Sequence, residues 1–161
     1  MKAIIIGTSL VGKTTLIKYL RNTTKLPVSE MDEELAKLNN NVYPSDDNYK
    51  HRVLAPKVVN NILDLDEIIF FTNTDYFTPQ DLQKARRKGF KVIQLLLDIK
   101  ELQRRNEYRV KNDGYSDLSQ WFEGMINYQD NIKLKGLVDK EIVAAQPIED
   151  IANELLIELV K

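Results

Sequence analysis

The chain has 161 residues, which is enough for one domain with a substantial buried core. Its 23 lysines and arginines nearly balance its 24 aspartates and glutamates, so overall charge gives no support for binding to nucleic acid or to an anionic membrane. Cysteine is absent, which excludes disulfides, thiolate metal sites and a cysteine nucleophile; no stretch approaches the ~20 apolar residues of a membrane-spanning helix, and we expect a cytoplasmic protein.

The first element in the chain is the apolar, β-branched run Ile4-Ile5-Ile6, which has the composition of a buried strand. Residues 7–14 then read Gly-Thr-Ser-Leu-Val-Gly-Lys-Thr and match the pattern G-x-x-x-x-G-K-[ST], with an amphipathic stretch after it. In this strand–loop–helix context the glycines permit a tight turn, and N–H groups at the helix start attract phosphate. An ordinary glycine turn is the alternative, but the spacing favours a phosphate-binding loop for a nucleoside triphosphate.

Within this loop, Lys13 is assigned to the β- and γ-phosphates and the Thr14 hydroxyl to Mg²⁺. A helix is expected to follow over residues 14–21, because apolar residues recur on one face. The residues predicted to bind the nucleotide here are Gly7, Thr8, Ser9, Leu10, Val11, Gly12, Lys13, Thr14 and Thr15.

A short second strand is expected over residues 25–29, and four acids follow within five residues. One interpretation is structural: Ser29 caps a helix that has Asp32 at its third position. The other is functional: Glu30 helps to hold Mg²⁺ and its water, while Asp32 accepts a proton from a substrate hydroxyl. The two interpretations are compatible, because a cap and a catalytic acid can share one turn.

Residues 39–49 have the composition of a loop, and a helix is expected over 56–63, with Pro56 either starting it or kinking a longer helix. The single histidine, His51, has no second histidine with which to share a metal. Arg52 is a candidate for gripping an anionic substrate, although an exposed arginine is more often only solvated.

A third, buried strand is expected over residues 67–71. Many phosphate-loop proteins place a Mg²⁺-directed acid at the end of such a strand, whereas the first acid here, Asp75, comes a little later. We treat Asp75 as a candidate for substrate binding. Thr78 and Asp81 have the spacing of a capping box, which predicts that a helix starts there and runs to about Lys88.

A fourth strand is expected over residues 91–97, and a helix follows in which Arg105 and Arg109 share one face. An ion pair between Glu101 and Arg105 would be an ordinary helix contact. The functional interpretation places both guanidinium groups over the triphosphate. An Asn-, Asp- and Gly-containing stretch comes next, so we expect a lid at about 104–118.

The remaining elements are a helix over 119–134, a short strand over 141–145 and a last helix that begins near Pro147. Strands and helices therefore alternate five times, which predicts an α/β fold with three αβα layers and a five-stranded parallel sheet. Ligands bind at the carboxyl ends of such strands, so the loop and the acids are expected to meet at one edge.

With these elements the chain resembles the small phosphate-loop (P-loop) kinases, the group that includes shikimate kinase, gluconate kinase and the nucleoside monophosphate kinases. The resemblance covers nearly the whole length in its order of elements, and its most specific part is the 7–14 motif. The acidic stretch 30–35 is similar to the motif after the second strand of shikimate kinase. That match implies a place for Glu30 near Mg²⁺ and for Asp32 near the reacting hydroxyl.

The same resemblance implies nucleotide contacts elsewhere. The arginines around Arg105 resemble lid arginines that touch phosphates and flank the base, and the turn at Gln146 and Pro147 lies where this group lets backbone touch the adenine. The chain departs from shikimate kinase after the third strand, because Thr-Asn-Thr at 72–74 replaces a run of three glycines.

We therefore expect a single-domain enzyme (1–161) that uses ATP and Mg²⁺ to phosphorylate a small-molecule hydroxyl, on a nucleoside, a nucleotide or a metabolite. The candidate catalytic residues are Lys13, Asp32, Arg105 and Arg109, and the candidate substrate contacts are Asp32, Arg52 and Asp75. One alternative is a regulatory ATP-binding or NTPase switch module, although the D-x-x-G and N-K-x-D patterns of small GTPases are absent. Another is a polynucleotide 5′-hydroxyl kinase, but the balanced charge makes nucleic acid an unexpected partner.

Overall fold

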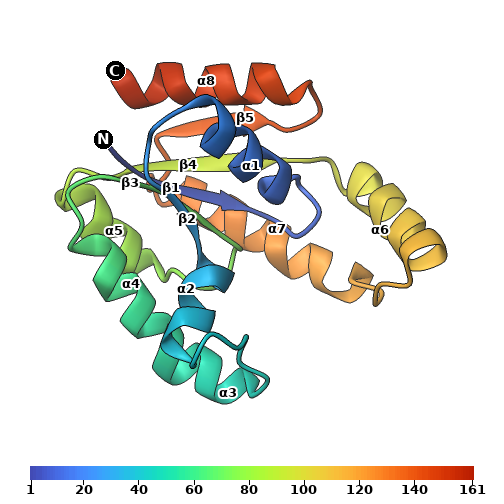
Figure 1. Ribbon diagram of the computed structural model, residues 1–161. Coiled ribbons are helices and arrows are strands. Elements are labelled where there is room, and N and C mark those ends of the chain that lie inside the picture. Colours follow the sequence, from blue (N-terminus) through green and yellow to red (C-terminus); the bar gives the residue numbers. More distant parts are fainter.

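Five strands form one sheet in the computed structural model, which describes residues 1–161, and the central strands β1 and β3 are the richest in β-branched and aromatic residues (Figure 1). All neighbouring strands are parallel, in the order β2-β3-β1-β4-β5. The predicted five-stranded parallel sheet is confirmed. The strands are β1 (Lys2–Gly7), β2 (Val28–Glu30), β3 (Ile68–Thr72), β4 (Lys91–Leu96) and β5 (Lys140–Val143).

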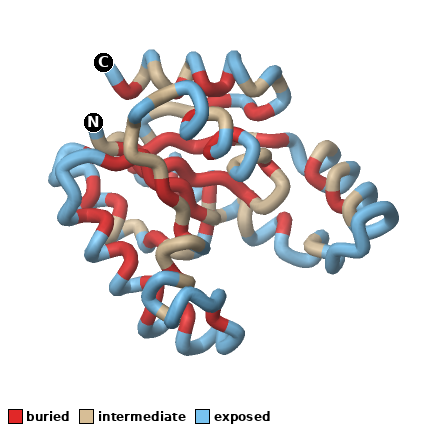
Figure 2. The backbone as a smooth tube through the Cα atoms, in the orientation of Figure 1, coloured by how far each residue is buried: buried red, intermediate tan, exposed pale blue.

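Helices cover both faces of this sheet, so the predicted three-layer arrangement is also confirmed (Figure 1). Successive β1 side chains point to opposite faces. Ala3 and Ile5 pack toward α1 and α8, whereas Ile4 and Ile6 pack toward α2, α4 and α5. Figure 2 shows the buried residues concentrated in the central strands. The covering helices are α1 (Lys13–Thr23) and α8 (Ile148–Val160) on one face, and α2 (Met31–Leu38), α4 (Ala55–Leu63), α5 (Pro79–Arg87) and α7 (Ser119–Leu134) on the other.

Helix α6 (Ile99–Asp113) projects away from the sheet layers (Figure 1). Gly114 ends it in the left-handed conformation, with φ of 67°. The Asn106 side chain then joins α6 to the start of α7, because it donates to Asp117 (2.7 Å) and accepts from the Leu118 N–H (2.9 Å). Helix α6 and the segment that leads into α7 therefore form an arm beside the carboxyl edge of the sheet.

Two expectations about helix starts were wrong in detail. Residues 47–49 are helical rather than loop: α3 (Asp47–Tyr49) runs through a π-helical segment, η1 (Lys50–Leu54), directly into α4. Pro56 thus lies inside a longer helix, which is the second of the two possibilities considered for it, and the wider π turns precede the residue that cannot donate a backbone hydrogen bond.

Ser29 does not cap α2. It is the central residue of β2 and donates to the Glu34 carboxylate, while Glu30 occupies the N-cap position without a side-chain cap. The capping box at Thr78 and Asp81 is confirmed, with both reciprocal hydrogen bonds present (3.0 and 3.1 Å).

Both chain ends lie together at the amino end of the sheet (Figure 1). The Met1 carbonyl accepts a hydrogen bond from Ile68 at the start of β3, and Lys91 at the start of β4 donates to the carbonyl of Glu158. The loops that follow the strands lie at the opposite edge of the sheet, where the strands end. No helix combines the length and the apolarity required to cross a bilayer.

Candidate active site

The phosphate loop lies between β1 and α1 at the carboxyl edge of the sheet. Its turn needs left-handed backbone at Leu10 (φ 69°) and Gly12 (φ 103°). A Cβ on Gly7 would lie 2.7 Å from Val11 Cγ1, so only glycine fits without a shift of the loop. The loop feeds directly into α1, whose unpaired N–H groups face the same space.

The Lys13 side chain folds back across this loop. Its Nζ donates to the carbonyl oxygens of Gly7 (2.8 Å) and Thr8 (2.7 Å). Burial lowers the pKa of Lys13 to about 8, against the opposing influence of Asp32 and Glu30. The buried ammonium has two carbonyl partners in place of water, so an anion bound in the loop would stabilise its positive charge.

A cleft of about 510 Å³ opens above the loop, which is within the usual range for small-ligand sites. It brings together residues that are far apart in the sequence: Thr14 and Thr15 at the start of α1, Glu30 and Asp32 at the end of β2, and Arg109 on α6. The sequence-predicted loop, the acidic turn and one of the two arginines therefore share one cleft.

Glu30 and Asp32, the two acids in this cleft, have raised pKa values, whereas the pKa of the neighbouring Glu33 is lowered. Burial raises the pKa of Asp32, and Lys13 opposes that rise. Burial, followed by the neighbouring carboxylates, also raises the pKa of Glu30. Glu33, in contrast, forms an ion pair with Arg21 (2.7 Å) that lowers its pKa. Asp32 is therefore a more basic carboxylate than an ordinary aspartate, as a proton acceptor requires.

The donors in the cleft fit Mg²⁺. This ion prefers oxygen ligands, keeps several waters and is bound through one or two carboxylates plus substrate phosphates. Thr14 and Glu30 supply a hydroxyl and a carboxylate beside the loop that would hold those phosphates. The raised pKa of Glu30 also marks a carboxylate whose negative charge a cation would stabilise.

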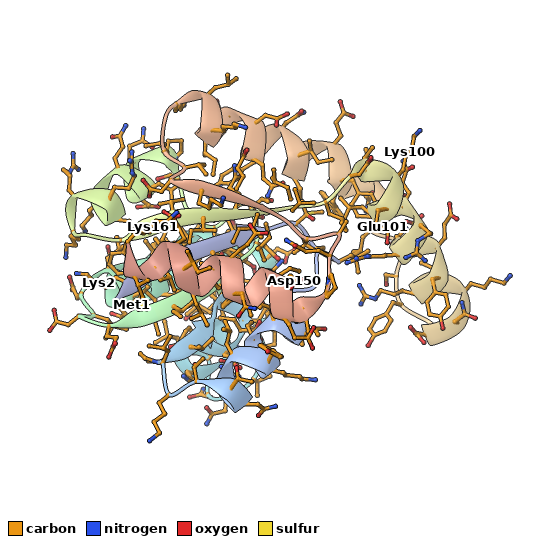
Figure 3. All side chains as sticks on the ribbon, turned by 90° about the horizontal axis from the view of Figure 1, so that it is seen from above. Met1, Lys2, Lys100, Glu101, Asp150 and Lys161 are labelled. Atoms are coloured by element: carbon orange, nitrogen blue, oxygen red, sulfur yellow. The ribbon has the colours of Figure 1, made fainter.

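Arg105 and Arg109 share a face of α6 but have different partners. Arg105 donates to the carbonyl of Leu10 in the phosphate loop (2.9 Å) and to Glu101 (3.1 Å), which Figure 3 labels near the base of α6. The ordinary helix ion pair that we considered for Arg105 is therefore present, and the same guanidinium also contacts the phosphate loop. Arg109 lines the phosphate cleft, and its guanidinium lies over the Tyr115 ring, 4.1 Å from the centroid.

A second cavity of about 370 Å³ adjoins the loop at Ser9. The segment after β3 forms one wall, including Asn73 and Asp75, and α7 forms another. Asp75, the candidate substrate contact, is thus one of the residues that line this cavity. Arg52 is exposed and is not among the residues that line this cavity or the phosphate cleft.

Sequence reasoning missed Lys50, whose side chain is only 10% exposed. Its Nζ contacts Tyr43 Oη and Asp47 Oδ1, both at 3.1 Å, and its charge acts on Asp32. Nothing in the local pattern indicates this contact, because it depends on how the 39–46 segment folds back onto the helix.

His51, for which no second histidine offered a shared metal site, packs against an aromatic ring. Its ring stacks on Tyr76 with centroids 5.0 Å apart, and its Nε2 lies 4.0 Å from Asp75. Burial raises the pKa of Tyr76 well above its ordinary value. These side chains lie beside the cavity that Asp75 lines.

The turn predicted to touch a base lies between β5 and α8. The Gln146 side chain donates to the carbonyl of Val143 (2.8 Å) and to Glu154 (2.9 Å), so it holds the turn against α8. A further cavity of about 310 Å³ lies between the phosphate loop and α6, with Arg105 and Tyr108 in its lining.

No family model matches the sequence, and no curated protein matches it. Solved structures do match over 99% of the chain. Shikimate kinase from Aquifex aeolicus is 17% identical, with 96% of its chain covered and a TM-score of 0.73. Shikimate kinase from Acinetobacter baumannii, in complex with shikimate, is 16% identical, with 92% of its chain covered and a TM-score of 0.75. A gluconokinase from Sinorhizobium meliloti is 16% identical, with 91% of its chain covered and a TM-score of 0.63. The chain therefore has the fold of the P-loop small-molecule kinases.

Proposed function

We propose that the protein is an ATP- and Mg²⁺-dependent phosphotransferase that moves the γ-phosphoryl group to a hydroxyl of a small molecule. The observation that carries the proposal is the position of Asp32. This carboxylate of raised pKa lines the same cleft as the phosphate-loop Lys13, beside a separate cavity of a size suited to an acceptor. The matched kinases have the same fold and support the assignment.

In the proposed reaction, loop amides and Lys13 hold the triphosphate while Arg109 approaches it from α6. Bound Mg²⁺, held by Thr14 and Glu30, would neutralise phosphate charge. The acceptor oxygen forms a bond to the γ-phosphorus as the bond to the β–γ bridging oxygen breaks, and ADP leaves. Asp32 takes the proton of the hydroxyl. This work is mainly positioning and charge compensation, as phosphoryl transfer requires.

We further propose that residues 104–118 act as a lid and that 1–161 form one catalytic domain. Support comes from the exposed 113–117 segment and from Arg105, which connects α6 to the loop carbonyl of Leu10. Closure of this arm would bring Arg109 over the phosphates and exclude water. The base would lie toward α6 and the Gln146–Pro147 turn, in a cytoplasmic enzyme.

An acceptor panel tests the proposal. Purified protein with ATP and Mg²⁺ is offered nucleosides, nucleoside monophosphates, shikimate, gluconate and a 5′-hydroxyl oligonucleotide. ADP release and the mass of the product are recorded for each. We expect acceptor-dependent ADP release with a small molecule and none with the oligonucleotide.

The matched variants are Asp32→Asn and Glu33→Gln. We expect Asp32→Asn to lower kcat by ~10²–10⁴ with little change in ATP affinity, because it removes the proton acceptor. Glu33→Gln changes an adjacent acid whose partner is Arg21, so it should alter stability and leave kcat unchanged. Tight ATP binding without acceptor-dependent ADP release, and unaffected by Asp32→Asn, would contradict the proposal and favour a nucleotide-binding switch.

A further inference from the structure

The cavity beside the phosphate loop is lined on one side by a single face of α7. Trp121, Met125 and Tyr128 are spaced by four and three residues, so they point the same way from the helix. Gly124 lies between them and leaves open space, because a Cβ at this position would have no heavy atom within 4 Å. The result is a flat aromatic and thioether wall.

This wall is held rigidly against the rest of the site. Tyr128 Oη donates to the carbonyl of Phe77, which fixes α7 to the segment after β3 (2.6 Å). Met125 Sδ accepts a contact from the Ser9 N–H of the phosphate loop (3.4 Å). Trp121 itself is 58% exposed, an unusual amount for an indole, so its ring is available to a ligand.

The charge of this cavity is negative. Asp75 supplies a carboxylate, and no lysine, arginine or histidine is among the lining residues. Asn73, Thr74 and Ser9 add neutral polar groups. A carboxylate or phosphate on the acceptor would need a cation here, because burying an unpaired anion is costly.

The cations around the cavity are already engaged. Lys50 contacts Tyr43 and Asp47, and Lys13 spans the phosphate loop. Arg109 lies over Tyr115 in the phosphate cleft. The Nε2 atom of His51 lies 4.0 Å from the Asp75 carboxylate.

From this combination we infer that the phosphoryl acceptor is an uncharged or cationic hydroxyl compound with a planar ring, such as a nucleoside, and not a carboxylate or a phosphate ester. The ring stacks on Trp121, Asp75 and the neutral polar groups bind its donors, and its hydroxyl points toward Asp32. This inference rests on the proposed kinase function, because it names the substrate class of the same site.

Trp121 provides a binding assay that does not depend on catalysis, since it is the single tryptophan of the chain. Its fluorescence is titrated with matched pairs that differ only in an anionic group: each common nucleoside against its 5′-monophosphate. Saturating ADP and Mg²⁺ keep the monophosphates out of the phosphate loop. At about pH 7.5, where an ordinary histidine is neutral, we expect at least one nucleoside to bind ~10-fold or more tightly than its monophosphate.

Variants test the Trp121 ring and the Asp75 carboxylate separately. Trp121→Ala, measured by calorimetry, should weaken nucleoside binding by ~5- to 150-fold, the range for loss of one base–aromatic stack, and leave ADP binding unchanged. Glu123→Ala, at an exposed position of the same helix outside the cavity, is the control and should change neither. Asp75→Arg should reverse the preference within a pair.

Tighter binding of the monophosphates, or no response to any nucleoside, would overturn the acceptor assignment. The kinase proposal fails in a different way: a nucleoside would bind at Trp121 with the expected preference, yet ATP and Mg²⁺ would yield no phosphorylated product. Conversely, ADP release with an anionic acceptor alone would retain the kinase and reject the inferred substrate class.

Discussion

Replacement of Lys13 by methionine tests whether the phosphate loop holds an unfavourably buried charge. The pKa of this lysine falls from its ordinary 10.5 to about 8, with burial as the largest cause. One pKa unit corresponds to about 1.4 kcal/mol, so the ammonium costs the ligand-free fold about 3 kcal/mol at neutral pH. Lys13→Met removes that cost. It also removes the hydrogen bonds to two loop carbonyls, and the loss of each bond lowers the free energy of unfolding by about 1 kcal/mol.

The pH dependence isolates the charge from the lost hydrogen bonds. Between pH 8 and 10.5 the unfolded chain binds a proton on Lys13 that the folded chain does not. The free energy of unfolding of the wild type should therefore rise with pH across this window, relative to Lys13→Met, by about 3 kcal/mol in total. Other lysines and tyrosines titrate equally in both proteins and cancel in the difference.

Urea unfolding followed by Trp121 fluorescence, without nucleotide, gives this difference at each pH. If the difference in free energy of unfolding between the wild type and Lys13→Met stays constant from about pH 7 to pH 10.5, the reasoning is refuted, because Lys13 is then well solvated. ATP with Mg²⁺ provides the complementary measurement. It should stabilise the wild type by mass action and leave Lys13→Met nearly unaffected.

Three further substitutions have distinct expected outcomes. Arg105→Ala should raise the KM for ATP by ~10-fold or more, because a charge-assisted bond to the loop is lost at about 1.5–3 kcal/mol, whereas Lys100→Ala, at an exposed position of α6 that lines neither the phosphate cleft nor the cavity beside α6, should leave the KM unchanged. Gly7→Ala should lower the free energy of unfolding by ~1–3 kcal/mol in urea titrations, since its Cβ would overlap a loop side chain, and an unchanged value would show that the loop can widen. Thr78→Ala should cost ~1 kcal/mol in the same assay without altering kinetics; a change in kcat would assign Thr78 a role beyond capping.

The layers of this fold could be predicted because each element carries its own signal. Buried strands such as β3 are continuous apolar runs, and the phosphate loop and the Thr78 capping box have fixed spacings. Ser29 was predicted incorrectly because its hydroxyl fits a cap equally well by spacing. Its place in β2 instead lets it bond Glu34 from the strand. A local pattern could not choose between these two partners.

The candidate site also has one part that could be predicted from the sequence and another part that could not. The phosphate loop consists of contiguous residues, so Lys13 and Thr14 could be named as candidates from the motif alone. The cavity beside the loop is assembled from the segment after β3 and from α7, which meet only through tertiary packing. Lys50 consequently carried no recognisable signal, and Arg52 was considered for a substrate role although it lies outside both cavities.

The location of the two chain ends has a practical consequence. Met1 and Lys161 lie near each other on the side of the sheet remote from the loops (Figures 1 and 3). An affinity tag, a fluorescent protein or a surface tether attached to either end would therefore leave the cleft facing outward. A short peptide joining the ends would also permit the chain to be reopened at the exposed 113–117 segment, which would break the connection between α6 and α7 without removing a residue.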